Sequence, residues 1–118
     1  MSTQLSPEDA VRRFFDCYSN GRPDDFDECV ASDYLDYGHE PPGIGPAGAR
    51  ADYEQAVKRA GGLISYTIDA LVADGDMVAT AWTGTMPSHG TFQGLSLYRV
   101  AGGLLRSTRH ALIGDIPA

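Results

Sequence analysis

The chain has 118 residues, of which 42% are hydrophobic and 21% charged, so the sequence predicts a single globular domain over residues 1–118. Sixteen acidic residues against nine Lys and Arg give a formal charge of −7 with no basic stripe, which excludes nucleic acid as a partner. No apolar run approaches the ~18 residues of a membrane span, and no basic, apolar signal segment opens the chain, so we expect a cytoplasmic protein without membrane contact.

The first half of the chain carries the signals of three helices. Ser6-Pro7 suits a helix cap and first turn, and Asn20-Gly21 ends that helix. A second, short helix is expected from about Pro23, and a third over about residues 47–60. The expected buried faces are Val11, Phe14, Phe15 and Tyr18 on the first helix, and Phe26, Cys29 and Val30 on the second.

The segment between the second and third helices is rich in polar and aromatic side chains. Residues 32–40 predict a short strand running into a loop, and they include Asp36, Tyr37 and His39. Residues 41–46 contain three prolines and two glycines, so they predict a loop or flap rather than regular structure.

The second half of the chain is rich in β-forming residues. Strands are predicted over residues 63–73, 77–85, 91–100 and 104–115, and Asp74-Gly75-Asp76 is a strong hairpin turn between the first two. Four antiparallel strands in a meander, after three helices, indicate a two-layer α+β domain.

The cysteines and histidines form no recognisable metal or redox motif. Cys17 and Cys29 lie on expected helices, and buried reduced thiols are the better interpretation of both. His89 is expected in a turn, and His110 on the outside of the sheet or in a subunit interface. We therefore predict no metal site.

Several short segments carry a family resemblance. They are Asn20-Gly21 before an acidic second helix, Tyr34-Leu35-Asp36, Trp82-Thr83, and the runs over residues 72–79 and 94–100. In these segments the chain resembles the nuclear-transport-factor-2-like superfamily, and within it the SnoaL-like polyketide cyclase group. The resemblance implies a cone-shaped, curved antiparallel sheet wrapped by three N-terminal helices around a central apolar cavity.

The resemblance also implies which side chains face that cavity. With its register, strand alternation places Thr80, Trp82, Ser96 and Tyr98 inside, together with Arg109, Ala111 and Ile113 of the last strand. His110 and Leu112 then face the other way. The expected substrate-binding residues are Phe14, Tyr53, Trp82, Ser96, Tyr98 and Ile113.

The acid positions of characterised relatives are not filled in the expected way. The three roles of ketosteroid isomerases fall on Phe14, on Tyr37 or Gly38, and on Ser96. The last-strand Asp of SnoaL-like cyclases falls on Ile113, four residues after Arg109, although Asp115 lies two residues further on the same face.

The remaining polar candidates predict cofactor-free acid–base catalysis, and the resemblance implies a polyketide-like or other apolar, carbonyl-bearing molecule as its substrate. Asp36 or His39 would be the base, and Arg109 or Tyr37 would stabilise an enolate oxygen. Structural roles compete with these: Asp36 as a loop cap or as the partner of Arg109, and His39 as an exposed loop residue.

A second class of function stays open, a non-catalytic ligand-binding or dimerisation module. An Arg109 side chain outside the cavity would favour it. In either case we expect a homodimer through the outer sheet face, because Leu95, Leu97 and Met77 are apolar where a monomer would carry polar groups.

Overall fold

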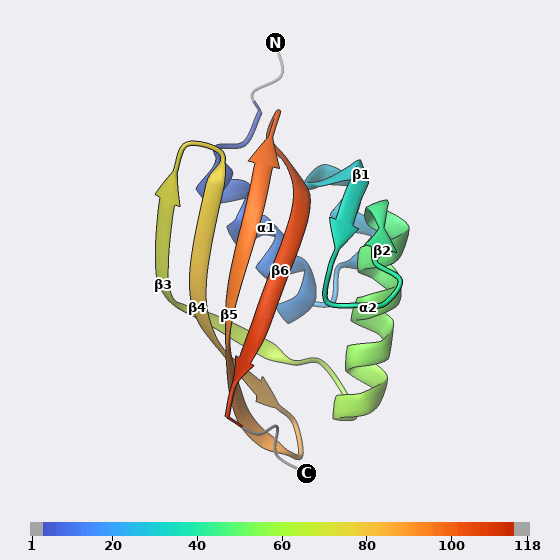
Figure 1. The fold of residues 1–118 in the computed structure, drawn as a ribbon. Coiled ribbons are helices and arrows are strands. Elements are labelled where there is room, and N and C mark those ends of the chain that lie inside the picture. The colour runs from blue at the N-terminus through green and yellow to red at the C-terminus, as the bar shows by residue number, and fades with distance from the viewer. Residues whose placement is uncertain (1–3, 115–118) are drawn as a thin grey trace.

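The computed structural model describes residues 4–114 and confirms the α+β class (Figure 1). Within them the elements follow in this order: α1 (Pro7–Ser19), the 3₁₀ helix η1 (Pro23–Glu28), β1 (Val30–Asp36), β2 (Gly43–Ile44), α2 (Gly45–Ala60), β3 (Ser65–Asp74), β4 (Met77–Met86), β5 (Gly90–Ala101) and β6 (Leu104–Ile113). No helix in this part of the chain is long and apolar enough to cross a membrane.

Local chemistry explains where α1 begins and ends. The Ser6 hydroxyl accepts a hydrogen bond from the Asp9 backbone N–H at 3.1 Å, and proline occupies the first turn. Asn20 caps the other end, and Gly21 follows with a positive φ of 66°. Val11, Phe14 and Phe15 are buried on the face that meets the sheet.

The six strands form one sheet in the order β2-β1-β6-β5-β4-β3. The four long strands pair antiparallel in chain order, which confirms the predicted meander. β1 joins the sheet beside β6 as a parallel neighbour, and β2 pairs with β1. In Figure 1, α1 crosses behind the long strands and α2 lies beside β1 and β2, so no helix of residues 4–114 covers the opposite face of the long strands.

Two local predictions are wrong. Cys29 and Val30 do not continue the second helix, because η1 ends at Glu28 and Val30 opens β1, although both side chains are buried. Residues 41–46 are not entirely a loop, since Gly43–Ile44 form β2 and α2 begins at Gly45. The free thiols of Cys17 and Cys29 are both buried, as expected.

The predicted cavity register of the last strand is also wrong. Val100 pairs with Leu105 and Arg99 with Ser107, so Arg106 is an extra residue that forms a bulge in β6. One extra residue reverses the side-chain alternation, and Thr108 rather than Ser107 is buried after Leu105. As a result Arg109 and Ile113 face away from the helices.

Candidate functional site

A pocket of about 220 Å³ lies between the helices and the covered face of the sheet. Aromatic rings from α1 and four strands form much of its wall: Phe14, Phe15, Tyr18, Tyr34, Tyr66, Trp82, Phe92 and Tyr98. Many of these rings pack edge to face, for example Tyr66 on Trp82 at 5.4 Å between ring centroids and Trp82 on Phe92 at 5.5 Å. The pocket is therefore suited to an apolar molecule of modest size.

Two carboxylates interrupt this aromatic wall. Asp36 is the last residue of β1 and is only 5% exposed, and Asp52 projects from α2. The Oδ1 atom of Asp36 accepts a hydrogen bond from the Gly38 backbone N–H at 2.8 Å, so this carboxylate does cap the loop that follows it. The other oxygen, Oδ2, is not used by the cap.

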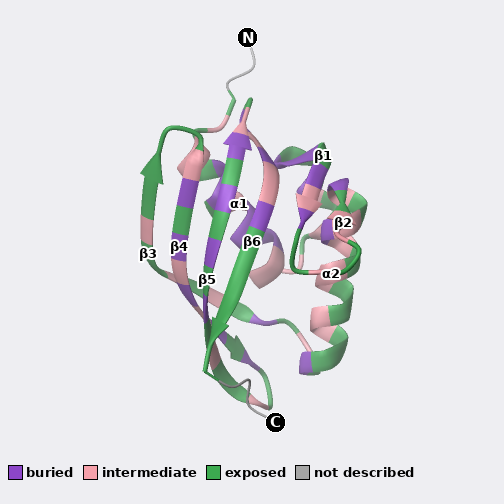
Figure 2. Ribbon diagram, in the orientation of Figure 1, coloured by how far each residue is buried: buried purple, intermediate pink, exposed green. Residues whose placement is uncertain are grey.

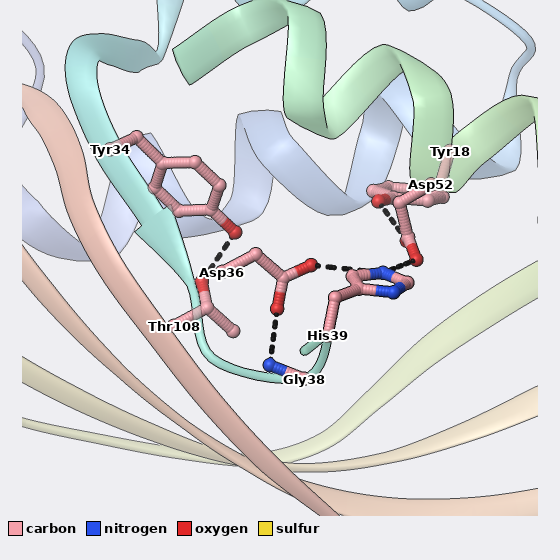
Figure 3. Close-up of polar contacts among 7 residues, drawn as sticks. All are labelled: Tyr18, Tyr34, Asp36, Gly38, His39, Asp52 and Thr108. Atoms are coloured by element: carbon pink, nitrogen blue, oxygen red, sulfur yellow. Dashed lines mark hydrogen bonds and ion pairs between the residues drawn. The ribbon is translucent and has the colours of Figure 1, made fainter. Parts of the chain in front are cut away.

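His39 links the two carboxylates (Figure 3). Its Nε2 lies 2.6 Å from Oδ1 of Asp52 and 3.5 Å from Oδ2 of Asp36. The second oxygen of Asp52 accepts a hydrogen bond from the Tyr18 hydroxyl at 2.6 Å. Burial raises the pKa of Tyr18 well above its ordinary value, and the Asp52 charge raises it further. Tyr18 is thus a neutral donor that holds Asp52, which in turn orients His39.

His110 completes the polar end of the pocket from the sheet side. It lines the pocket, and its ring lies so close to Gly38 that a Cβ atom at position 38 would be 2.2 Å from Cε1 of His110 and 3.0 Å from Oδ1 of Asp36. Glycine at position 38 therefore lets the imidazole approach the Asp36 loop. The expectation that His110 faces outward is wrong, because the β6 bulge reverses its orientation.

Hydroxyl groups line the sheet wall of the pocket. Tyr34 donates to Oγ1 of Thr108 at 2.8 Å, and Trp82 Nε1 donates to Oγ of Ser96 at 2.8 Å. Both acceptor hydroxyls keep a hydrogen of their own to donate. Burial raises the pKa of Tyr98, so its phenol is also a neutral donor at physiological pH.

The structure brings together some predicted site residues and separates others. Asp36, Phe14, Trp82, Ser96 and Tyr98 line the pocket. His39 contacts both carboxylates without lining the pocket itself. The other predicted residues lie outside the pocket. Tyr53 packs against Tyr18 and Phe26, and Ile113 is 52% exposed. Tyr37 is exposed, and the guanidinium carbon of Arg109 lies 4.1 Å from the centroid of its ring. Asp115 lies outside the described residues.

Sequence reasoning missed Asp52, Tyr18 and His110 as site residues. A signal for Asp52 does exist, because it shares the three-and-four spacing of Ala49, Ala56 and Ala60, which are small residues on the buried side of α2. A carboxylate on such a stripe is unusual. His110 had no comparable signal, since its orientation depends on the bulge.

The same polar cluster has the composition of a metal site. One ligand atom from each of Asp36, His39 and Asp52 lies within 4.8 Å of the others. Imidazole and carboxylate oxygens suit several divalent ions. An ion held by all three side chains would take the place of the short hydrogen bond between His39 and Asp52.

The SnoaL-like domain family matches residues 11–108. The chain belongs to this family. No curated protein matches it.

Solved structures with the same fold are distant in sequence. A protein of unknown function with a cystatin-like fold from Methylobium petroleophilum has a TM-score of 0.77 at 22% identity, covering 96% of this chain and 81% of that one. A provisionally named polyketide cyclase from Acidithiobacillus ferrooxidans has a TM-score of 0.75 at 22% identity, over 95% and 91%. A provisionally named ketosteroid isomerase from Kribbella flavida has a TM-score of 0.78 at 18% identity, over 95% and 81%. At these identities the likeness shows the fold alone.

Proposed function

We propose that the protein is a cofactor-independent acid–base enzyme that acts on a small apolar, carbonyl-bearing molecule, with Asp36 as the base. One observation carries the proposal: a buried carboxylate faces an aromatic pocket while His39 Nε2 lies 3.5 Å from one of its oxygens. A carboxylate in such a place is a suitable proton acceptor, because few waters compete with the substrate.

The proton transfer follows from the two different oxygens of Asp36. Oδ1 is held by the Gly38 N–H, which fixes the carboxylate and leaves Oδ2 on the side of His39. The carboxylate takes a proton from the carbon next to the substrate carbonyl, and the C–H electron pair moves into an enolate. The proton then returns to the same carbon or to another one, so the reaction needs no oxidant or reductant.

Neutral hydroxyl groups replace Arg109 and Tyr37 as the stabilisers of the enolate oxygen. Thr108, Ser96 and Tyr98 line the pocket from the sheet, and each can donate a hydrogen bond. Preorganised donors of this kind stabilise developing negative charge because they do not have to reorient. The Arg109 mechanism expected from sequence is not retained, since that side chain is exposed on the other face.

The family and its solved neighbours support this class of reaction. Two structures with the same fold bear names of enzymes that act on carbonyl compounds, a polyketide cyclase and a ketosteroid isomerase. We also propose that the curved sheet has the cone shape around a central cavity that the family implies. Fold alone does not specify chemistry, and the acid–base assignment is supported by the contacts of Asp36 with Gly38 and His39.

A non-catalytic ligand-binding or dimerisation module remains a second candidate. The outward position of Arg109 favours it, because the pocket then lacks the cation that sequence reasoning assigned to an enolate. In this case the pocket would hold an apolar ligand and the bare sheet face would pair with a second copy.

Deuterium exchange distinguishes the two candidates. In deuterium oxide the protein should accelerate exchange of the α-protons of 2-tetralone, a small aromatic ketone, as followed by proton NMR. Asp36→Asn should reduce this rate by at least about a hundredfold, since it removes the base. Asp33→Asn is the matched control, because Asp33 is an exposed carboxylate on the same strand. A wild-type rate equal to that of buffer, over a panel of such ketones, would leave only the binding module.

A further inference from the structure

The charges around the pocket are unevenly distributed. Asp36 and Asp52 are the two carboxylates among its lining residues in the described part of the chain, and the imidazoles of His39 and His110 adjoin Asp36. With His counted as neutral, as in the formal charge of the chain, the carboxylates give the polar end a negative formal charge. Arg59 is the one guanidinium among the lining residues of the described chain. It is exposed and lies seven residues beyond Asp52 on α2, or about 10 Å along the helix.

Aromatic rings surround this negative end. Tyr18 donates to Asp52, and its ring packs edge to face against Tyr66 at 5.9 Å and against Phe14 at 5.3 Å. Burial and then the Asp52 charge raise the pKa of Tyr66, which places this phenol within the field of the carboxylate. Ring faces attract cations, most strongly where water is excluded, and a nearby carboxylate adds to that attraction.

The two carboxylates differ in access. The Asp36 side chain is 7% exposed and that of Asp52 is 30% exposed, so Asp52 is the more accessible of the two. One oxygen of Asp52 accepts from Tyr18 and the other contacts His39. Each oxygen keeps a second lone pair, so Asp52 can still pair with a charged group of a bound molecule while Asp36 meets the reacting carbon. An anionic group at the same place would be repelled by both carboxylates.

We propose that the molecule bound in this pocket carries a cationic nitrogen, a protonated or quaternary amine, held between Asp52 and the aromatic wall. That this molecule is a substrate, and not only a ligand, rests on the proposed function. The binding preference itself depends only on the pocket and its charges.

Three matched probes test the preference in the full-length protein. They are 3-hydroxyphenyltrimethylammonium, its neutral isostere 3-tert-butylphenol, and the anion 3-hydroxybenzenesulfonate. Isothermal titration calorimetry should show that the cation binds at least about tenfold more tightly than the neutral isostere and that the anion binds most weakly. Equal affinity of cation and isostere, or no saturable binding of either, would overturn the inference.

Variants separate the pocket from the general acidity of the chain. Asp52→Asn should remove most of the preference for the cation over 3-tert-butylphenol. Glu54→Gln removes the same charge from an exposed position on α2 and should leave the preference unchanged. An equal loss in both variants would mean that net charge, not the pocket, attracts the cation, and would also overturn the inference.

The deuterium-exchange experiment is independent of these titrations. Exchange without a cation preference would remove the inference and keep the proposed function. A cation preference without α-proton exchange on any ketone would contradict the enzyme proposal and would still support a cationic ligand.

Discussion

The two faces of the long strands differ in chemistry although they are built from alternate residues of the same segments. The face toward the helices carries Trp82, Ser96 and Tyr98 around the pocket. The other face carries Ala70, Val72, Ala79, Ala81, Leu95, Leu97 and Ala111, and Arg109 lies among them. Figure 2 shows the alternation along β5, where buried and exposed residues succeed one another. One face can recognise a ligand through varied polar groups, whereas the other offers a mainly apolar surface to a flat partner.

The largest expected effect concerns the pocket face, whose buried tyrosines should make the free energy of unfolding depend on pH in alkaline solution. Burial raises the pKa values of Tyr18, Tyr34, Tyr66 and Tyr98, all of which line the pocket. Because the folded pKa lies above the unfolded one, their stabilising contribution is complete below about pH 10 and is lost as the pH rises above it. The free energy of unfolding should fall steeply there, as urea titrations would measure. Four tyrosines that ionised well before unfolding would contradict the burial of these phenols.

A steric change should affect the pocket face far more than the open face. In Gly94→Ala the new Cβ would lie 2.3 Å from Cζ2 of Trp82, so the indole must move and its hydrogen bond to Ser96 is put at risk. Overpacking of this kind costs about 1–3 kcal/mol. Leu95→Ala, at the neighbouring residue but 50% exposed, should cost less than about 1 kcal/mol in a monomer. Urea unfolding measures both, and equal losses would contradict the contrast between the faces.

The open face should matter for assembly rather than for folding. We propose that it pairs two copies of the chain, since Val72, Leu95 and Leu97 are 67%, 50% and 41% exposed on it. Light scattering should then give twice the 12.6 kDa mass of one chain, and Leu97→Glu should give the monomer. A wild-type mass of one chain at micromolar concentration would remove the dimer from the proposal.

Sequence patterns predicted the elements well because each one depends on local signals. Caps, glycines and alternation located α1 and the four long strands without information about distant contacts. The parallel pairing of β1 with β6 joins segments about seventy residues apart, and no local pattern encodes it. For the candidate site, the sequence pointed to Asp36 and His39, and their roles stay predictions. It did not point to Asp52, which comes from α2 and not from the segment that holds the other two. Arg109 was misplaced because a single extra residue, Arg106, reverses the face of everything after it.

The smallest expected effect belongs to the residue that sequence reasoning ranked among the most important. Arg109 is exposed and lies over the Tyr37 ring, so Arg109→Met removes an exposed cation–π contact worth about 0.5–1 kcal/mol and changes nothing inside the pocket. Exchange of 2-tetralone α-protons should stay within about twofold of wild type, whereas loss of an oxyanion donor would reduce it about a hundredfold. Ser96→Ala is the matched comparison, because its hydroxyl is on the strand beside Arg109 but faces the pocket, and this change should slow exchange measurably. A large loss of exchange rate in Arg109→Met, together with an unchanged rate in Ser96→Ala, would show that the faces of β6 are assigned the wrong way round.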